Sequence, residues 1–390
     1  MKKVILAFSG GLDTTFCTIY LKEKGYEVIT ATVNTGGFSP EDLKQIEEKS
    51  KKLGASKHYT VDAKDRIYED IIQYLIKLNG LYEEDYPLMC ADRYIIAEEI
   101  LKIAEKENAE AVAHGSTAVG NDQVRFDGSF LSLNSGIELV TPIKELGITR
   151  SEEMSFLAER GVFVDHVYTK YSVNQNIFGI TVSGTEVDEN KEPDEGAYQL
   201  TKKDGNAQSE YLTLEFSEGV PSKLNGQELP GIEILMKLNS MLGKYGYGSD
   251  IYIGDCIIGI KGRILFEAPG LLALVEAHRK LEQLVLTKKQ IVFSRGAGAQ
   301  WTDLVYSGLY YEPLVKDLEN FADSVQKRVT GTVTIKAEAN RITVVELASP
   351  YSLVRKDIAM YAQKAGWSAE EANGFIKLHT MQQQLAGMKK

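Results

Sequence analysis

Continuous apolar runs alternate with amphipathic stretches through the first part of the chain. The run VILAF (Val4–Phe8) has no polar position, which is typical of a parallel strand buried on both faces. The stretch after it predicts a helix that ends at Gly25, and the apolar run 26–34 predicts a second strand. Ser39 and Pro40 then suit the N-cap and first position of a helix. This alternation predicts an α/β fold with a doubly wound parallel sheet.

The alternation continues to about residue 116. The segment KHYTV predicts a third strand, and the periodicity predicts helices over about 63–78 and 92–108. Residues 109–116 predict another strand, which runs into a glycine-containing loop. Ligands of doubly wound sheets bind at the carboxyl ends of the strands. The loops 7–15 and 115–125 both leave such ends, so we expect the binding site there.

Beyond about residue 165 the pattern changes to short alternating runs, among them LTLEF, IYIGDCIIGIKGRILFEA and VTGTVTIKAEANRITVVEL. These runs predict a second, α+β half with antiparallel strands and a few helices, including one over Pro269 to Leu286. The segment GTEVDENKEPDEG predicts an exposed acidic loop, and the C-terminal run predicts an amphipathic helix. We therefore divide the chain into a domain at 1–166, a second at 167–366 and a C-terminal helix at 367–390.

Composition narrows the class of protein. The chain has 390 residues, 43% of them hydrophobic, and a net charge of −11, which opposes a nucleic-acid surface because such surfaces need clustered Lys and Arg. Cys17, Cys90 and Cys256 lie far apart without a CxxC pair, so neither a disulfide framework nor a zinc site is indicated. The sequence shows no secretory h-region and no long apolar span, and we expect a cytoplasmic protein with no membrane partner.

The first informative loop is AFSGGLDTT. Its glycines allow close approach of the backbone to a ligand, and its position at a helix N-terminus favours an anion such as phosphate. The lysine of the GxxxxGK[ST] motif is absent, so ordinary γ-phosphate transfer is not indicated. Asp13 suits either a helix cap or help in holding a metal ion. A tight turn before a capped helix remains the alternative interpretation.

The second informative loop is AHGSTAVGNDQVRFD. Its amide, carboxylate and guanidinium groups suit a zwitterionic ligand, because an amino acid needs acceptors and a bidentate cation. A solvated polar loop is the alternative. His114, just before it, is either a ligand-polarising group or a hydrogen-bonded structural histidine. Nothing in the loop is an obvious covalent nucleophile.

These loops carry a resemblance to a known family. SGGLDTT resembles the SGGxD[ST] pyrophosphate loop of the N-type ATP pyrophosphatases, with Thr14 where most members have serine. HGSTAVGNDQVRFD resembles the HGxTGKGNDQVRFE segment of argininosuccinate synthases, although Ala118 and Val119 replace a Gly-Lys pair. The resemblance continues in order through YSVNQNIFGITVSG, GIKGRILFEAPG, LVYSGLYYEP, VTGTV and GFIKLH. The chain thus resembles argininosuccinate synthases along nearly its whole length.

The resemblance implies a fold and a reaction. It implies an adenine nucleotide α-hydrolase-like first domain and an oligomerisation helix at the C-terminus, which in the family reaches across a homotetramer. Members use ATP and Mg²⁺ to adenylate the ureido oxygen of citrulline and release pyrophosphate. Aspartate then attacks the activated carbon and expels AMP, in arginine biosynthesis. No resident metal and no protein nucleophile are implied.

The resemblance also implies roles for individual residues. The catalytic set would be Asp13, Asp122 and Arg125. The ATP site would comprise Ala7, Phe8, Ser9, Gly10, Gly11, Leu12, Asp13, Thr14, Thr15, Val33 and Gly115. Aspartate would bind Thr117, Asn121 and Asp122. Citrulline would bind Tyr86, Cys90, Arg93, Asn121, Arg125, Ser172, Thr181 and Ser183.

Departures from the family pattern cluster at one end of the acceptor site. Cys90 replaces a serine, Ser183 and Gly254 stand at glutamate positions, and Phe266 replaces a tyrosine that serves the α-amino end of citrulline. An ammonium buried without a carboxylate is costly. Two alternatives follow. Either other residues bind the α-amino group of citrulline, or the acceptor lacks a free amine and is an N-acylated citrulline or another ureido compound.

Two further interpretations lie outside this reaction. One is an N-type enzyme that thiolates or amidates tRNA or a nucleotide, which the acidity, the absence of CxxC and the GNDQVRFD loop disfavour. The other is a catalytically silent nucleotide-binding paralogue.

Overall fold

The first half of the chain forms a five-stranded parallel sheet. In this computed structural model, which describes residues 1–134, 136–163, 170–205 and 207–388, the strand order is β3-β2-β1-β4-β5, with every neighbouring pair parallel. The predicted parallel sheet is confirmed. Its strands are β1 (Lys2–Ala7), β2 (Tyr26–Asn34), β3 (Lys57–Asp62), β4 (Ala111–Ala113) and β5 (Glu138–Val140).

Helices cover both faces of this sheet, as a doubly wound fold requires. Side chains alternate along β1, so Val4 and Leu6 pack into one core while Ile5 packs into the other. The first core includes residues of α1 (Leu12–Glu23), α2 (Pro40–Lys52), α7 (Pro142–Leu146) and α8 (Arg150–Glu159). The second includes residues of α5 (Asp92–Glu107) and α6 (Asp122–Leu133). Strand order reverses at β1 and β4, which places a switch point between the two predicted loops.

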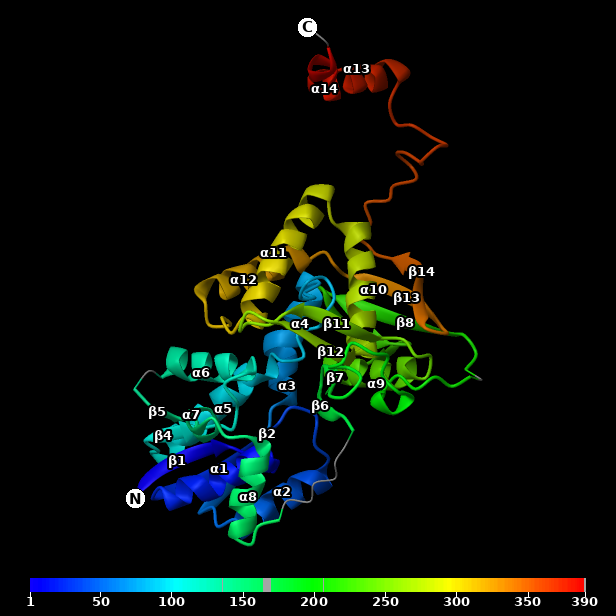
Figure 1. Cartoon of the computed structure of the whole chain (residues 1–390). Helices are drawn as coiled ribbons and strands as arrows, with labels where there is room; N and C mark the ends of the chain where they lie inside the picture. Colours follow the sequence, from blue (N-terminus) through cyan, green and yellow to red (C-terminus); the bar gives the residue numbers. More distant parts are fainter. Residues whose placement is uncertain (135, 164–169, 206, 389–390) are drawn as a thin grey trace.

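The predicted helix over 63–78 is three consecutive segments: α3 (Lys64–Ile67), the π-helical η1 (Tyr68–Ile72) and α4 (Gln73–Leu78). Figure 1 shows this part of the chain rising from the lower sheet into the upper part of the molecule, where α4 packs against α10 (Pro269–Val285), α11 (Lys288–Tyr306) and α12 (Pro313–Gln326). A segment of the first half is thus built into the second.

The second half contains two antiparallel sheets. One has the order β10-β9-β8-β13-β14, and the other β11-β12-β7-β6. The helix α9 (Gly231–Gly243) packs against β9 and α10, and the short 3-10 segment η2 (Glu195–Ala197) precedes β8. The strands are β6 (Ser172–Asn176), β7 (Gly179–Ser183), β8 (Glu210–Ser217), β9 (Val220–Leu224), β10 (Gln227–Glu228), β11 (Ser249–Asp255), β12 (Lys261–Glu267), β13 (Gly331–Glu338) and β14 (Arg341–Ala348).

Several local predictions differ from the structure in extent. The strand predicted over 109–116 is only three residues long, because the chain turns into a loop after Ala113. The acidic segment is largely exposed, yet Val187 within it is fully buried in a small core with Tyr171 and Leu265. The predicted boundary between residues 166 and 167 lies within 164–169, outside the described residues.

The C-terminal part extends away from the body. After β14 the chain runs out to α13 (Ala369–His379) and α14 (Met381–Gly387), which Figure 1 shows at the far end of the molecule. The predicted helix is thus present but breaks at Thr380. Its large apolar side chains are exposed, among them Phe375, Ile376, Leu378, Met381 and Leu385. Among the described residues, none of the helices has the length and apolarity needed to cross a membrane.

Candidate active site

The loop between β1 and α1 has the geometry of an anion cradle. Gly10 has φ +76°, a left-handed conformation that favours glycine, and Gly11 is the N-cap of α1 without any side-chain cap bond. The amides at the start of this helix are therefore not capped by a side chain, at the end where the helix dipole favours negative charge. Lys49 donates to the Gly10 carbonyl over 2.6 Å and fixes the turn from α2.

The two threonines of this loop differ in environment. Thr15 is fully buried, and its hydroxyl donates back to the Gly11 carbonyl over 2.6 Å. Thr14 lines a cavity, and its hydroxyl lies 3.4 Å from that of Ser9. Ser9 and Thr14 are thus the hydroxyls of the loop that a ligand can reach.

The second predicted loop lies directly against the first. A Cβ added to Gly115 would lie 3.2 Å from the Asp13 Cβ, so the small residue permits this approach. His114 behind it is 2% exposed; its Nε2 lies 2.7 Å from Asp127 Oδ1, and its Nδ1 accepts from the Ser116 amide over 3.1 Å. Both ring nitrogens thus have partners within the chain, which favours a structural role in anchoring the loop, and His114 also lines the cavity described next.

A cavity of about 1070 Å³ joins the two loops to the second half of the chain. Almost all of the predicted site residues line it; Gly10 and Thr15 do not. From the first loop and its neighbours come Ala7, Phe8, Ser9, Gly11, Leu12, Asp13, Thr14, Val33 and Gly115. From the remaining elements come Tyr86, Cys90, Arg93, Thr117, Asn121, Asp122, Arg125, Ser172, Thr181 and Ser183.

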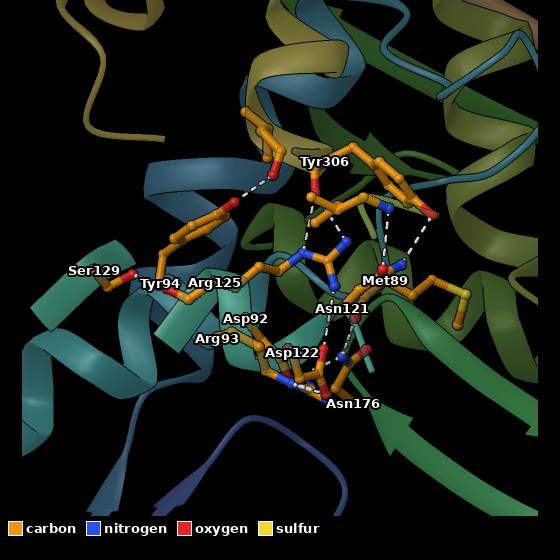
Figure 2. A network of polar contacts seen from close by, with 12 residues as sticks. Met89, Asp92, Arg93, Tyr94, Asn121, Asp122, Arg125, Ser129, Asn176 and Tyr306 are labelled. Atoms are coloured by element: carbon orange, nitrogen blue, oxygen red, sulfur yellow. Dashed lines mark hydrogen bonds and ion pairs between the residues drawn. The ribbon is translucent and has the colours of Figure 1, made fainter. Parts of the chain in front are cut away.

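An alternating network of charges forms the floor of this cavity (Figure 2). Arg93 donates through Nε and Nη2 to Asp122 Oδ2 over 3.1 and 2.9 Å, and through Nη1 to Asp92 over 2.5 Å. Arg125 donates to Asp122 Oδ1 over 3.1 Å and, with two other nitrogens, to the Tyr306 carbonyl. Asn176 of β6 donates to Asp92 over 3.0 Å, which ties the second half to the network.

The network fixes the charges of its members. Burial opposes the ionisation of Asp122, but the adjacent guanidinium groups of Arg93 and Arg125 outweigh burial and lower the pKa of this carboxyl below its usual value. In the same way, burial opposes the charge of Arg93, and the carboxylates of Asp122 and Asp92 more than offset it, so its pKa is raised. The site thus contains two fixed cations bridged by one carboxylate.

The far end of the cavity is aromatic. The Tyr86 ring lies 5.2 Å from that of Tyr252 and at right angles to Phe266, and Tyr306 stacks on Tyr82 with ring centroids 3.7 Å apart. Cys90 lines the cavity beside this cluster, and burial raises the pKa of its thiol. Cys90 is therefore a neutral packing residue, not a thiolate.

Two strands of the second half complete the wall. Ser172 of β6 pairs with Ser183 of β7, and Asn174 pairs with Thr181, so their polar side chains meet the cavity together. The three hydroxyl-bearing positions predicted from the segment YSVNQNIFGITVSG therefore belong to a single hairpin.

Sequence reasoning missed several residues of this site. Asp92 is buried and holds Arg93 and Asn176, but a carboxylate at the start of a predicted helix reads as an ordinary first-turn residue. Tyr252 and Tyr306 look like core positions in strand and helix patterns. Arg150 is the first residue of α8 and lines the cavity, and no local pattern in the sequence indicates the direction of its side chain.

Comparisons with known proteins agree along the chain. A family model described as the arginosuccinate synthase N-terminal HUP domain matches residues 3–163, and the corresponding C-terminal domain model matches residues 171–386. The argininosuccinate synthase of Xanthomonas campestris pv. campestris is 43% identical over 386 residues, covering 97% of both chains. That of Methanocaldococcus jannaschii is 40% identical and covers 99% of this chain and 98% of its own.

A solved structure titled as a predicted subunit of tRNA methyltransferase from Methanocaldococcus jannaschii covers 42% of this chain and 90% of its own, at 22% identity and a TM-score of 0.28, which is too low to bear on the fold. The matches to the two domain models, together with full-length relatives at about 40% identity, identify the family. The chain belongs to the argininosuccinate synthase family.

Proposed function

We propose that this chain joins aspartate to a citrulline-type ureido group at the expense of ATP, releasing AMP and pyrophosphate, in arginine biosynthesis. The observation that supports this most directly is the single cavity that reaches from the loop at Ser9–Thr14 to the Arg93–Asp122–Arg125 network and the β6–β7 hairpin. Three small substrates can lie in such a cavity side by side, which turns bimolecular steps into oriented ones.

The proposed chemistry needs two displacements. The ureido oxygen attacks the α-phosphorus of ATP, an O–P bond forms, and the bond to the β-phosphate oxygen breaks to release pyrophosphate. The aspartate amine then attacks the activated carbon, the C–O bond to AMP breaks, and the amine loses a proton. Charge that develops on the phosphates is stabilised by positioned donors, which the start of α1 supplies.

ATP use follows from the family, and we assign its contacts to the residues at the sheet edge. The pyrophosphate portion would lie on the Ser9–Thr14 loop, the adenine against the backbone of Val33 at the end of β2, and Gly115 would close the site. Mg²⁺ would enter as the ATP complex, with phosphate oxygens among its ligands. Asp13 is the carboxylate of this loop, and Arg150 adds a cation to the lining.

We assign the amino-acid substrates to the network. Aspartate would contact Thr117, Asn121 and Asp122. The acceptor would contact Arg93 and Arg125 together with the neighbouring lining residues Tyr86, Cys90, Asn121, Ser172, Thr181 and Ser183. The catalytic set would be Asp13, Asp122 and Arg125.

We also propose a homotetramer in the cytoplasm with no nucleic-acid partner. The exposed apolar side chains of α13 and α14 support assembly, because apolar side chains that the described part of the chain leaves uncovered suit contact with another subunit.

The proposal is tested by measuring pyrophosphate from the full-length protein with ATP, Mg²⁺ and aspartate, using citrulline, N-acetylcitrulline and N-succinylcitrulline in turn. We expect turnover that requires both aspartate and one ureido compound. Thr14→Ser should retain the reaction, whereas Thr14→Ala should raise KM for ATP. Absence of pyrophosphate with all three acceptors would contradict the assignment and favour a silent paralogue.

A further inference from the structure

The aromatic end of the cavity has an unusual wall at Tyr252. A Cβ added to Gly254 would overlap both the Tyr252 hydroxyl and the Glu83 carboxylate, so the ring can cross β11 at this point only because residue 254 is glycine. The Tyr252 hydroxyl donates to Glu83 Oε2 over 2.7 Å. Glycine and carboxylate together therefore hold the ring in one position.

The held ring faces the substrate cavity. Tyr252 is 5% exposed and lines the cavity, as do Gly262 and Ile264, which pair with Gly254 and Tyr252 across β11 and β12. Among the described residues, Glu83 is not part of the lining. The Tyr252 side chain thus forms part of the cavity wall, and its hydroxyl is bound to a carboxylate that is not part of the described lining.

The charges of the lining are unevenly placed. In the described part of the chain, its carboxylates are those of Asp13, Asp92 and Asp122. Asp92 and Asp122 are bound by the arginines of the network, and Asp13 belongs to the loop at the opposite end. No carboxylate among the described lining residues thus lies in the aromatic cluster of Tyr86, Tyr252 and Tyr306.

A free ammonium buried against this wall would have no counter-charge, which is unfavourable, whereas an amide nitrogen with an acyl group is neutral and can place its apolar portion on the rings. We infer that Tyr252, held across Gly254 by Glu83, makes this site select a ureido amino acid whose α-nitrogen is acylated over one whose α-nitrogen is free. This inference rests on the proposed ligase function and specifies its acceptor.

The test compares kcat/KM of the full-length protein for citrulline, Nα-acetylcitrulline and Nα-succinylcitrulline, with ATP, Mg²⁺ and aspartate held constant. We expect kcat/KM for at least one acylated compound to exceed that for citrulline by about tenfold or more. Replacing one buried, unpaired ammonium by a neutral amide can account for a difference of this size. Tyr252→Leu should reduce that ratio by a similar factor and leave KM for ATP unchanged. Tyr211→Leu, at an exposed tyrosine on β8, is the matched control and should keep the ratio.

Three results would overturn the inference. One is equal or better use of free citrulline, and another is an acyl preference that survives Tyr252→Leu in a folded variant. The third is a selective rise in KM for citrulline in Glu83→Gln, which would mean that Glu83 reaches the ammonium instead of the phenol. If no acceptor yields pyrophosphate, the ligase assignment itself fails. Each of the three results above requires turnover with at least one acceptor, so the two failures can be told apart.

Discussion

Asp122 accepts hydrogen bonds from two arginines through both of its oxygens, so it separates two cations as well as offering a carboxylate to a ligand. Its removal leaves Arg93 and Arg125 facing each other across the cavity floor. We therefore expect substitution of Asp122 to weaken binding of the amino-acid substrates more than binding of ATP at the Ser9–Thr14 loop.

The first prediction concerns this residue. Asp122→Ala should raise KM for aspartate by about tenfold or more, equivalent to about 1.4 kcal/mol, because the substrate ammonium loses its carboxylate. KM for ATP should change little. Steady-state kinetics with each substrate varied separately check this, with Asp317→Ala, an exposed carboxylate on α12, as the matched control. Equal effects on the two constants would argue against the assigned role.

Glu153 of α8 is a second residue with a clear consequence. It is 2% exposed, its Oε2 has no hydrogen-bond partner among the described residues, and burial followed by the nearby Asp13 carboxylate raises its pKa from 4.5 to about 7. The folded state therefore retains a proton that the unfolded chain has already lost between about pH 4.5 and 7. Folding stability from this group is present at low pH and is lost as the pH rises through that window.

The second prediction follows from that sign. Glu153→Gln stays neutral at every pH, so its Tm relative to the unmodified protein should be higher at pH 8 than at pH 5. Calorimetry across this range measures the difference. A relative Tm that does not change with pH would show that Glu153 is ionised in the folded protein throughout.

At the scale of elements, the start of α1 depends on one turn. Gly10 and Gly25 both have positive φ, at +76° and +88°, and flank the same helix. A Cβ at Gly10 would also lie 3.2 Å from Ile46, whereas no atom of the described residues lies within 4 Å of a Cβ at Gly25. An alanine at Gly25 would therefore lose stability only through backbone strain, whereas an alanine at Gly10 would add a close contact with Ile46.

The third prediction uses this pair. Each alanine variant should lose about 1–2 kcal/mol of unfolding free energy, because a side chain is strained in this conformation. Only Gly10→Ala should also raise KM for ATP, by about tenfold or more, since it displaces the loop toward the cavity. Denaturant unfolding and kinetics check both parts. An unchanged KM in Gly10→Ala would exclude the loop from ATP binding.

Elements with strong local signals were predictable from the sequence. The capping box at Ser39 is present, with its hydroxyl accepting from the Asp42 amide over 3.1 Å, and the buried β1 and β2 follow their apolar runs. The π-helical turn at Tyr68–Ile72 was not predictable, because its apolar spacing is also that of an α-helix.

The same division holds in the candidate site. The loops 7–15 and 115–125 could be predicted from their own residues and from their position at strand ends, and both line the same cavity. Tyr252 across Gly254 and the Glu83 carboxylate behind it come from distant segments, and no local pattern joins residue 83 to residue 252. Such contacts depend on how the two halves pack, which periodicity does not describe.

At the scale of the whole molecule, the extended C-terminal segment implies assembly. Phe375 is 65% exposed and Leu378 70% exposed on α13. The fourth prediction is that the protein is oligomeric by light scattering after gel filtration and that Phe375→Ser with Leu378→Ser lowers its mass. Lys377→Ser on the same helix is the control and should keep it. A monomeric unmodified protein would remove this prediction.

The halves are joined by a buried polar cluster where α4 enters the second half. Glu282 accepts from the side-chain amides of Asn79 and Gln326 over 2.7 and 2.6 Å, which turns both amide oxygens toward His278 at 3.0 and 2.8 Å. Both ring nitrogens of His278 thus have a partner in this cluster, one on α4's C-cap and one on α12. Asn79, at the end of α4, is thus fixed by residues some 200 positions later in the chain.

Because α4 lies inside that core, the two halves are not interchangeable modules. A fragment that begins at residue 170 would leave an empty groove between α10, α11 and α12, lined by apolar side chains such as Trp301 and by the Glu282 carboxylate without the amide of Asn79. A gene fusion that joined the first domain to a different second domain would also have to replace α4, because α4 packs against helices of the present second domain. The two matched domains can therefore be expected to have been inherited as one unit.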